Sequence, residues 1–161
     1  MIIVEDGSGV ANANSYVSLE QQKQYALSRG LTLPDTDEAI ESLMHQAVDY
    51  LQYNYQYKGE KTYPDAELEF PRTGIKGYAS DQIPTRVKNA QMQLATLAYT
   101  NDLAPVTSSG VVREKVDVIE VQYSDGGDVT SFQSDMIDNM LSPFTQSTSV
   151  GLLQQARVVR A

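Results

Sequence analysis

Residues 37–51 (DEAIESLMHQAVDYL) carry the clearest structural signal in this chain. Apolar side chains recur there at the spacing of one helical face, namely Ile40, Leu43, Met44, Ala47, Val48 and Leu51. Asp35 and Glu38 have the spacing of a capping box, and acidic residues in the first turn favour the helix dipole. The stretch therefore predicts an amphipathic helix, whose end within the tyrosine-rich residues 50–57 stays undecided.

Two further main helices and one short helix are predicted. Ser18, with Gln21 three residues later, predicts a capped helix over 19–29, and Gly30 stands where a left-handed residue ends a helix. Another helix starts near Pro84 and runs to about Asn101, because apolar residues again follow the helical spacing. A short helix with Met136, Ile137, Met140 and Leu141 on one side precedes Pro143.

The rest of the chain predicts a long loop and a β-hairpin. Residues 58–82 are punctuated by Gly59, Pro64, Pro71, Gly74 and Gly77, and are predicted to form one long loop. Near 111–124 apolar residues alternate with polar ones, which predicts a hairpin, although Asp117-Val118 is a poor two-residue turn. The expected fold class is mainly α: a small bundle of three main helices and one short helix, with this hairpin and an extended C-terminal arm.

The end of the chain differs in charge from the rest. The 161 residues contain 12 Lys and Arg against 21 Asp and Glu, a net charge of −9. Residues 139–161 hold two arginines and no acid, which is +2, so residues 1–138 carry −11. We expect a helical domain over 1–144 and an extended docking tail over 145–161, with a frayed terminus as the alternative. The candidate docking residues of this tail are Leu152, Leu153, Arg157, Val158, Val159 and Arg160.

The composition disfavours several functions. The absence of cysteine excludes disulfides, thiolate metal sites and cysteine nucleophiles. No apolar run reaches the length of a membrane span, and the negative charge disfavours binding to nucleic-acid phosphates or acidic membranes. His45 is the single histidine and lies at the edge of the apolar stripe, so no catalytic triad is predicted. We expect no enzyme activity, no catalytic residue, no cofactor and no metal site.

Two short segments bear on binding chemistry. Gly7-Ser8-Gly9 lacks the Lys-Ser/Thr of a phosphate-binding loop and the third glycine of a dinucleotide fingerprint. Asp65, Glu67 and Glu69 alternate with apolar residues, which favours a strand edge with solvent-facing acids over a metal site.

The tyrosines at positions 50, 53, 55 and 57 have three interpretations. They suit a protein interface, where a ring is buried while its hydroxyl stays wet, or an ordinary core at a helix end. They could also stack on single-stranded bases, but that mode normally needs a cationic groove. Here Lys58 and Lys61 flank the cluster, and acidic residues follow at once.

Several blocks spread along the chain resemble, in order, one protein family. They are NSYVS at 14–18, AVDYL at 47–51, LEFPRTG at 68–74, IPTRVKNA at 83–90, VREKV at 112–116, EVQY at 120–123 and RVVR at 157–160. This set resembles the head–tail adaptor (connector, or neck) proteins of tailed bacteriophages, often labelled DnaT-like single-stranded-DNA-binding proteins. The sequence departs from the family at Asp117-Val118, where Gly or Pro is expected.

The resemblance implies a structural role in the virion, with assembly in the host bacterial cytoplasm. Such proteins form a ring, commonly a dodecamer, beneath the portal. The tail would bind the portal protein, the ring would support the next neck or tail protein, and double-stranded DNA would pass through without specific binding. The implied subunit-interface candidates are Tyr53, Tyr57, Phe70, Pro71, Arg72, Ile119, Val121 and Tyr123. The alternative function is single-stranded-DNA binding by the cluster from Tyr50 to Tyr57.

Overall fold

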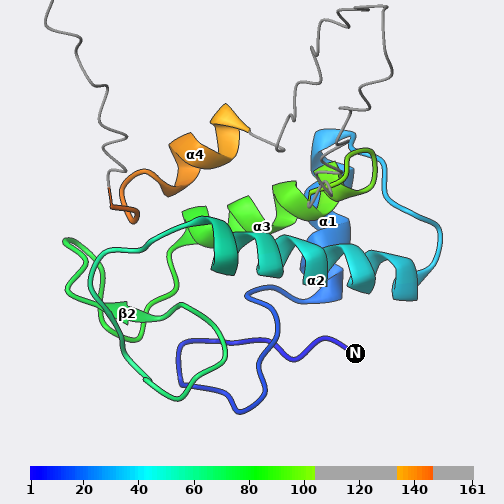
Figure 1. Ribbon diagram of the computed structural model, residues 1–161. Helices are drawn as coiled ribbons and strands as arrows, with labels where there is room; N and C mark the ends of the chain where they lie inside the picture. The colour runs from blue at the N-terminus through cyan, green and yellow to red at the C-terminus, as the bar shows by residue number, and fades with distance from the viewer. Residues whose placement is uncertain (104–133, 147–161) are drawn as a thin grey trace, which may run out of the picture.

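The computed structural model describes residues 1–103 and 134–146 (Figure 1). Its elements are α1 (Leu19–Arg29), α2 (Asp37–Asn54), β1 (Glu60–Lys61), β2 (Arg72–Thr73), α3 (Thr85–Ala98) and α4 (Asp135–Leu141). Helix α3 is central: it packs against α2, α4 and α1, and in Figure 1 α4 and α2 lie on opposite sides of it. The mainly helical class is confirmed, with four helices and one small antiparallel sheet among the described residues.

The observed strands do not coincide with the predicted hairpin. β1 and β2 pair antiparallel inside the predicted loop 58–82, with Glu60 opposite Thr73 and Lys61 opposite Arg72. Two-residue strands are too short to show an alternating pattern, so the sequence offered no signal for them. The hairpin predicted near 111–124, with Ile119, Val121 and Tyr123, lies outside the described residues. Residues 147–161 of the predicted tail also lie outside them.

Local capping signals set the bounds of α1. The Ser18 hydroxyl accepts a hydrogen bond from the Gln21 N–H, and the Gln21 side chain accepts one from the Ser18 N–H, which completes the predicted capping box. Gly30 follows the helix with φ of 64°, as predicted. Both ends of this helix therefore follow from residues within one turn of them.

The predicted ends of α2 and α3 need correction. Thr36, and not Asp35, caps α2, because the Thr36 hydroxyl accepts the hydrogen bond of the Ala39 N–H. Helix α3 begins at Thr85 after Pro84 and ends at Ala98, before the predicted end near Asn101. The Asn101 N–H and its side-chain amide both donate to the Leu97 carbonyl, so the chain turns there after the helix has ended.

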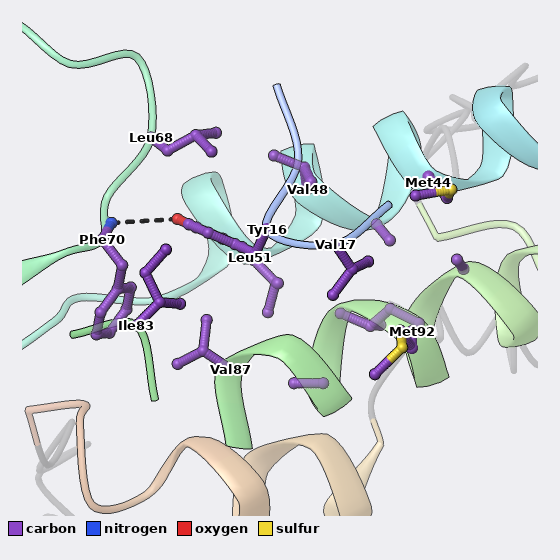
Figure 2. Packing of buried hydrophobic residues seen from close by; sticks show 14 of the residues in the cluster. Tyr16, Val17, Met44, Val48, Leu51, Leu68, Phe70, Ile83, Val87 and Met92 are labelled. Carbon is purple, nitrogen blue, oxygen red and sulfur yellow. Dashed lines mark hydrogen bonds between the residues drawn. The ribbon is translucent and has the colours of Figure 1, made fainter. Parts of the chain in front are cut away.

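The apolar core lies between α2, α3 and the loops (Figure 2). All six residues of the predicted α2 stripe are buried. The Tyr16 hydroxyl accepts a hydrogen bond of 3.2 Å from the Phe70 N–H, drawn as the dashed line in Figure 2, and the two rings meet edge to face. This contact joins the N-terminal segment to the loop between α2 and α3, 54 residues away in sequence.

Helix α3 also buries polar side chains against α1 and the segment before it. The Gln91 Oε1 accepts from the Tyr16 N–H, and its Nε2 donates to the Ser15 hydroxyl at 2.7 Å. The Gln22 Nε2 of α1 donates to the Met92 carbonyl. Hydrogen bonds at both ends of the Gln91 amide offset the cost of removing it from water. The Gln22 Oε1 is also buried but accepts no hydrogen bond from the described residues.

The N-terminal loop is organised around a buried carboxylate. Glu5 is fully buried, and its side chain accepts hydrogen bonds of 2.8–2.9 Å from the N–H groups of Gly7, Gly9 and Val10. Residues 1–15 therefore form a loop, closed by a bridge between Val4 and Ser15. Within residues 1–103 and 134–146, no helix combines the length and apolar character needed to cross a bilayer.

Candidate functional site

The end of α2 divides the tyrosine cluster. The helix stops at Asn54, and Tyr55 follows in an extended conformation with φ of −124°. Tyr50 and Tyr53 therefore stand on the helix, whereas Tyr55 and Tyr57 belong to the strand-like segment after it. The structure thus places the end of α2, which the sequence leaves undecided, at Asn54.

Tyr57 points into the core of the protomer. Its side chain is 5% exposed, its hydroxyl donates to the Leu51 carbonyl at 2.8 Å, and its ring meets Phe70 edge to face with centroids 4.9 Å apart. Burial raises the pKa of the Tyr57 hydroxyl well above its usual value, so it remains a neutral donor. For this residue the core interpretation is correct.

Tyr55 links the end of α2 to α4. Its hydroxyl donates to the Asp138 carboxylate at 2.6 Å, and its ring contacts Tyr50 edge to face. Burial, followed by the hydrogen bond to Asp138, raises the pKa of Tyr55. Tyr53 differs from these residues, because 81% of its surface is exposed. Of the four tyrosines, Tyr53 alone presents most of its ring to solvent.

The base of the C-terminal segment is fastened beside this cluster. The Lys58 N–H donates to the Phe144 carbonyl at 2.7 Å, and the Gln146 N–H donates to the Gln56 carbonyl at 2.8 Å. Two side chains add further bonds, from the Lys58 Nζ to the Pro143 carbonyl and from the Gln146 Nε2 to the Tyr57 carbonyl. Residues 56–58 and 143–146, which we call the tail base, therefore define where the following segment leaves the body.

Phe144 anchors the tail base in the apolar core. Its side chain is fully buried, and its ring meets the rings of Phe70 and Tyr78 edge to face, with centroids 6.0 and 5.2 Å apart. Such aromatic pairs add to the stability obtained from apolar burial alone. The tail base is thus connected to the central core and to the loop between α2 and α3.

Arg72 fastens the same loop internally. It is 8% exposed, and its Nε and Nη2 donate to the carbonyls of Lys58 and Gly59 at 2.8 Å each. Its Nη1 forms an ion pair with Glu69 at 2.5 Å, and Lys61 approaches the same carboxylate at 3.7 Å. The segment from Asp65 to Glu69 is not a strand, so the predicted strand edge is wrong. Asp65 and Glu67 face solvent as predicted, whereas Glu69 turns toward these cations.

The described interface candidates lie in two environments. Tyr57, Phe70, Pro71 and Arg72 are buried within the protomer, where their side chains build the body. Tyr53 is the one described candidate with an exposed side chain. Ile119, Val121, Tyr123 and the docking residues from Leu152 to Arg160 lie outside the described residues.

The structure also shows where His45 lies and which features could not be read from the sequence. His45 is half-buried on the wall of a shallow hollow on α2, and the described part of the chain brings no three metal-ligating side chains together. The buried Glu5 and the tail base were not predicted from the sequence. For Glu5 a signal was available, because the glycines that follow it allow the backbone to turn its N–H groups toward the carboxylate. The tail base had no such local signal, because it joins residues 85 or more positions apart.

These features define a small helical body with internally used aromatic residues and a fixed base for its C-terminal segment. The chain belongs to the family described as "Putative DnaT-like ssDNA binding protein", whose model matches residues 1–161. Searches of curated proteins and of solved structures returned no match.

Proposed function

We propose that this protein is a structural subunit of the neck of a tailed bacteriophage, a head–tail adaptor. Copies of the chain would form a ring, which we expect to be a dodecamer, beneath the portal protein. The C-terminal segment would bind the portal, and the ring would carry the next neck or tail protein. The protein would act in the virion, without enzymatic chemistry, cofactor or membrane, and double-stranded DNA would pass its acidic lumen without specific binding.

The tail base is the observation that carries this proposal. Four hydrogen bonds and the buried Phe144 hold residues 143–146 on the body. A docking segment needs such a fixed point of attachment, because force applied to the segment by a bound partner passes through that point to the folded domain. The basic and apolar sequence after residue 146 supplies the docking chemistry, and the resemblance to adaptor proteins supplies the partner.

A pull-down with purified portal protein tests the proposal. Deleting residues 147–161 should abolish capture while circular dichroism and the thermal midpoint of the body stay unchanged, because the tail base remains. The matched control is Leu27→Ala, an exposed residue on α1, which should be captured normally. Equal capture of the truncated and full chains would contradict the docking role.

Single-stranded-DNA binding is the second candidate, because the family description names that activity. Within the cluster from Tyr50 to Tyr57, the structure offers this mode one largely exposed ring, Tyr53, since Tyr57 is buried and Tyr55 bonds to Asp138. The acidic residues Asp49 and Glu67 line the hollow next to Tyr53, which disfavours phosphates.

Fluorescence titration with labelled oligonucleotide at low salt, where electrostatic binding is strongest, separates the two functions. We expect no micromolar binding by the full chain, and no difference between the native chain and Tyr53→Ala. Micromolar binding that Tyr53→Ala removes, while Tyr99→Ala does not, would favour the DNA-binding function. Tyr99 is the matched control because it is an exposed tyrosine at the end of α3.

A further inference from the structure

Tyr53 stands between two hollows on the surface of α2. One has a volume of about 230 Å³ and is bounded by Gln46, Asn54 and Leu103. The other has a volume of about 370 Å³ and runs past His45 toward the loop at residues 67–68. Asp49 and Tyr53, one helical turn apart, line both hollows, so together these form one continuous surface that we call the Tyr53 groove.

The chemistry of the Tyr53 groove suits a basic, partly apolar segment. Asp49 and Glu67 bring negative charge to it, and Asp102 lies at its far end. Among the described residues that line it, none is a lysine or an arginine. The exposed ring of Tyr53 adds a face on which a guanidinium can stack, since arginine is attracted to the negative face of an aromatic ring.

This chain carries a segment with the complementary chemistry. Residues 147–161 contain Arg157 and Arg160, the apolar residues Leu152, Leu153, Val158 and Val159, and no acid. The segment starts from Gln146, whose N–H donates to the Gln56 carbonyl, three residues along the chain from Tyr53. Fully extended, fifteen residues span about 50 Å, which is ample to bring either arginine to the groove.

We infer that the Tyr53 groove is the seat of the chain's own C-terminal segment, with Arg157 or Arg160 paired to Asp49 and stacked on Tyr53. Covalent attachment favours the chain's own segment, because it raises the effective concentration of the arginines at the groove. The contact would shelter the basic, apolar segment until a partner with higher affinity replaces it. It does not depend on that partner being a portal protein.

Paramagnetic NMR on the full chain tests this contact directly. Because the protein has no native cysteine, Ala161→Cys accepts a nitroxide label at one position. At low salt, the label should broaden the amide signals of residues 46–54. The broadening should be lost in Arg157→Gln/Arg160→Gln and in Asp49→Asn. Asp35→Asn, which removes an exposed acid before α2, is the matched control and should retain it.

Each other outcome overturns the inference. Absence of broadening at residues 46–54 would show that the segment lies elsewhere or that another part of the chain covers the groove. Broadening that survives removal of both arginines would exclude charge recognition.

A mixture of labelled chains and ¹⁵N-enriched unlabelled chains detects contact between molecules. Broadening in that mixture would assign the groove to the segment of a neighbouring copy and overturn the same-chain assignment. Portal capture is measured separately, so either proposal can fail alone.

Discussion

At the scale of single residues, two glycines with positive φ distinguish the cost of a left-handed backbone from the cost of a steric clash. Gly59 has φ of 69°, and a Cβ placed on it would lie 2.0 Å from the Thr73 carbonyl oxygen. Gly77 has φ of 87°, but a Cβ there would meet no atom within 4 Å. The two positions therefore share a left-handed backbone and differ in available space.

We predict that Gly77→Ala lowers the free energy of unfolding by about 1–2 kcal/mol, the cost of a left-handed alanine. Gly59→Ala should cost more than about 3 kcal/mol, because it also forces β1 away from β2. Urea denaturation followed by circular dichroism measures both values. Equal losses would mean that the loop relaxes around a side chain at residue 59.

The buried hydroxyl of Tyr57 predicts a stability change at alkaline pH. Burial raises the pKa of Tyr57 in the folded protein, whereas in the unfolded chain tyrosine ionises near pH 10. The resulting stability is complete below pH 10. Above it, the unfolded state binds fewer protons, so the free energy of unfolding falls by about 1.4 kcal/mol per pH unit for each such group.

Urea denaturation between pH 9 and about 11 checks this effect of tyrosine ionisation. In Tyr57→Phe the loss of stability per pH unit should be smaller by about 1.4 kcal/mol than in the native chain. The same variant should be about 1 kcal/mol less stable at neutral pH, because the hydrogen bond to Leu51 is lost. Tyr53→Phe, which removes the hydroxyl of an exposed ring, is the matched control. Identical slopes in native and Tyr57→Phe proteins would contradict the burial of this hydroxyl.

At the scale of elements, the tail base depends on one aromatic side chain. Phe144→Ala should lower the free energy of unfolding by about 3–5 kcal/mol, because it leaves a cavity facing Phe70 and Tyr78. Hydrogen exchange should show the Lys58 and Gln146 amides exchanging faster, because the two segments of the tail base separate. Pro143→Ala is the matched control, because that side chain is exposed and its carbonyl remains. Unchanged exchange at Lys58 in Phe144→Ala would mean that the tail base is held without this ring.

The elements also show what a single sequence could predict. The bounds of α1 and the buried stripe of α2 follow from residues within a few positions of each other, so caps and periodicity identify them. The buried amides of Gln22 and Gln91 look like surface residues in the sequence, because the groups to which they hydrogen-bond are about 70 positions away. The tail base and the ion pair between Arg72 and Glu69 could not be predicted for a related reason: they form only once distant or irregular segments meet.

At the scale of the whole molecule, the charge distribution predicts how assembly responds to salt. Residues 1–138 carry −11, so identical chains would repel one another as they approach to form the proposed ring. Screening shortens the range of that repulsion from about 30 Å at 0.01 M salt to about 8 Å at 0.15 M.

We therefore expect the fraction of oligomer in sedimentation velocity to rise with added salt at constant protein concentration. A variant with Glu20→Gln and Glu38→Gln, two exposed acids, should need less salt for the same fraction. Dissociation by salt would instead indicate that attractive ion pairs hold the copies together.

The loop around Glu5 has a consequence for the way this protein meets anions. Three converging backbone N–H groups, from Gly7, Gly9 and Val10, are the kind of nest in which other proteins hold a phosphate. Here the occupant is the chain's own carboxylate, so the nest is self-liganded and closed to external anions. Truncating Glu5 would leave these three N–H groups without their acceptor. The same side chain therefore both shapes this loop and excludes an external anion from it.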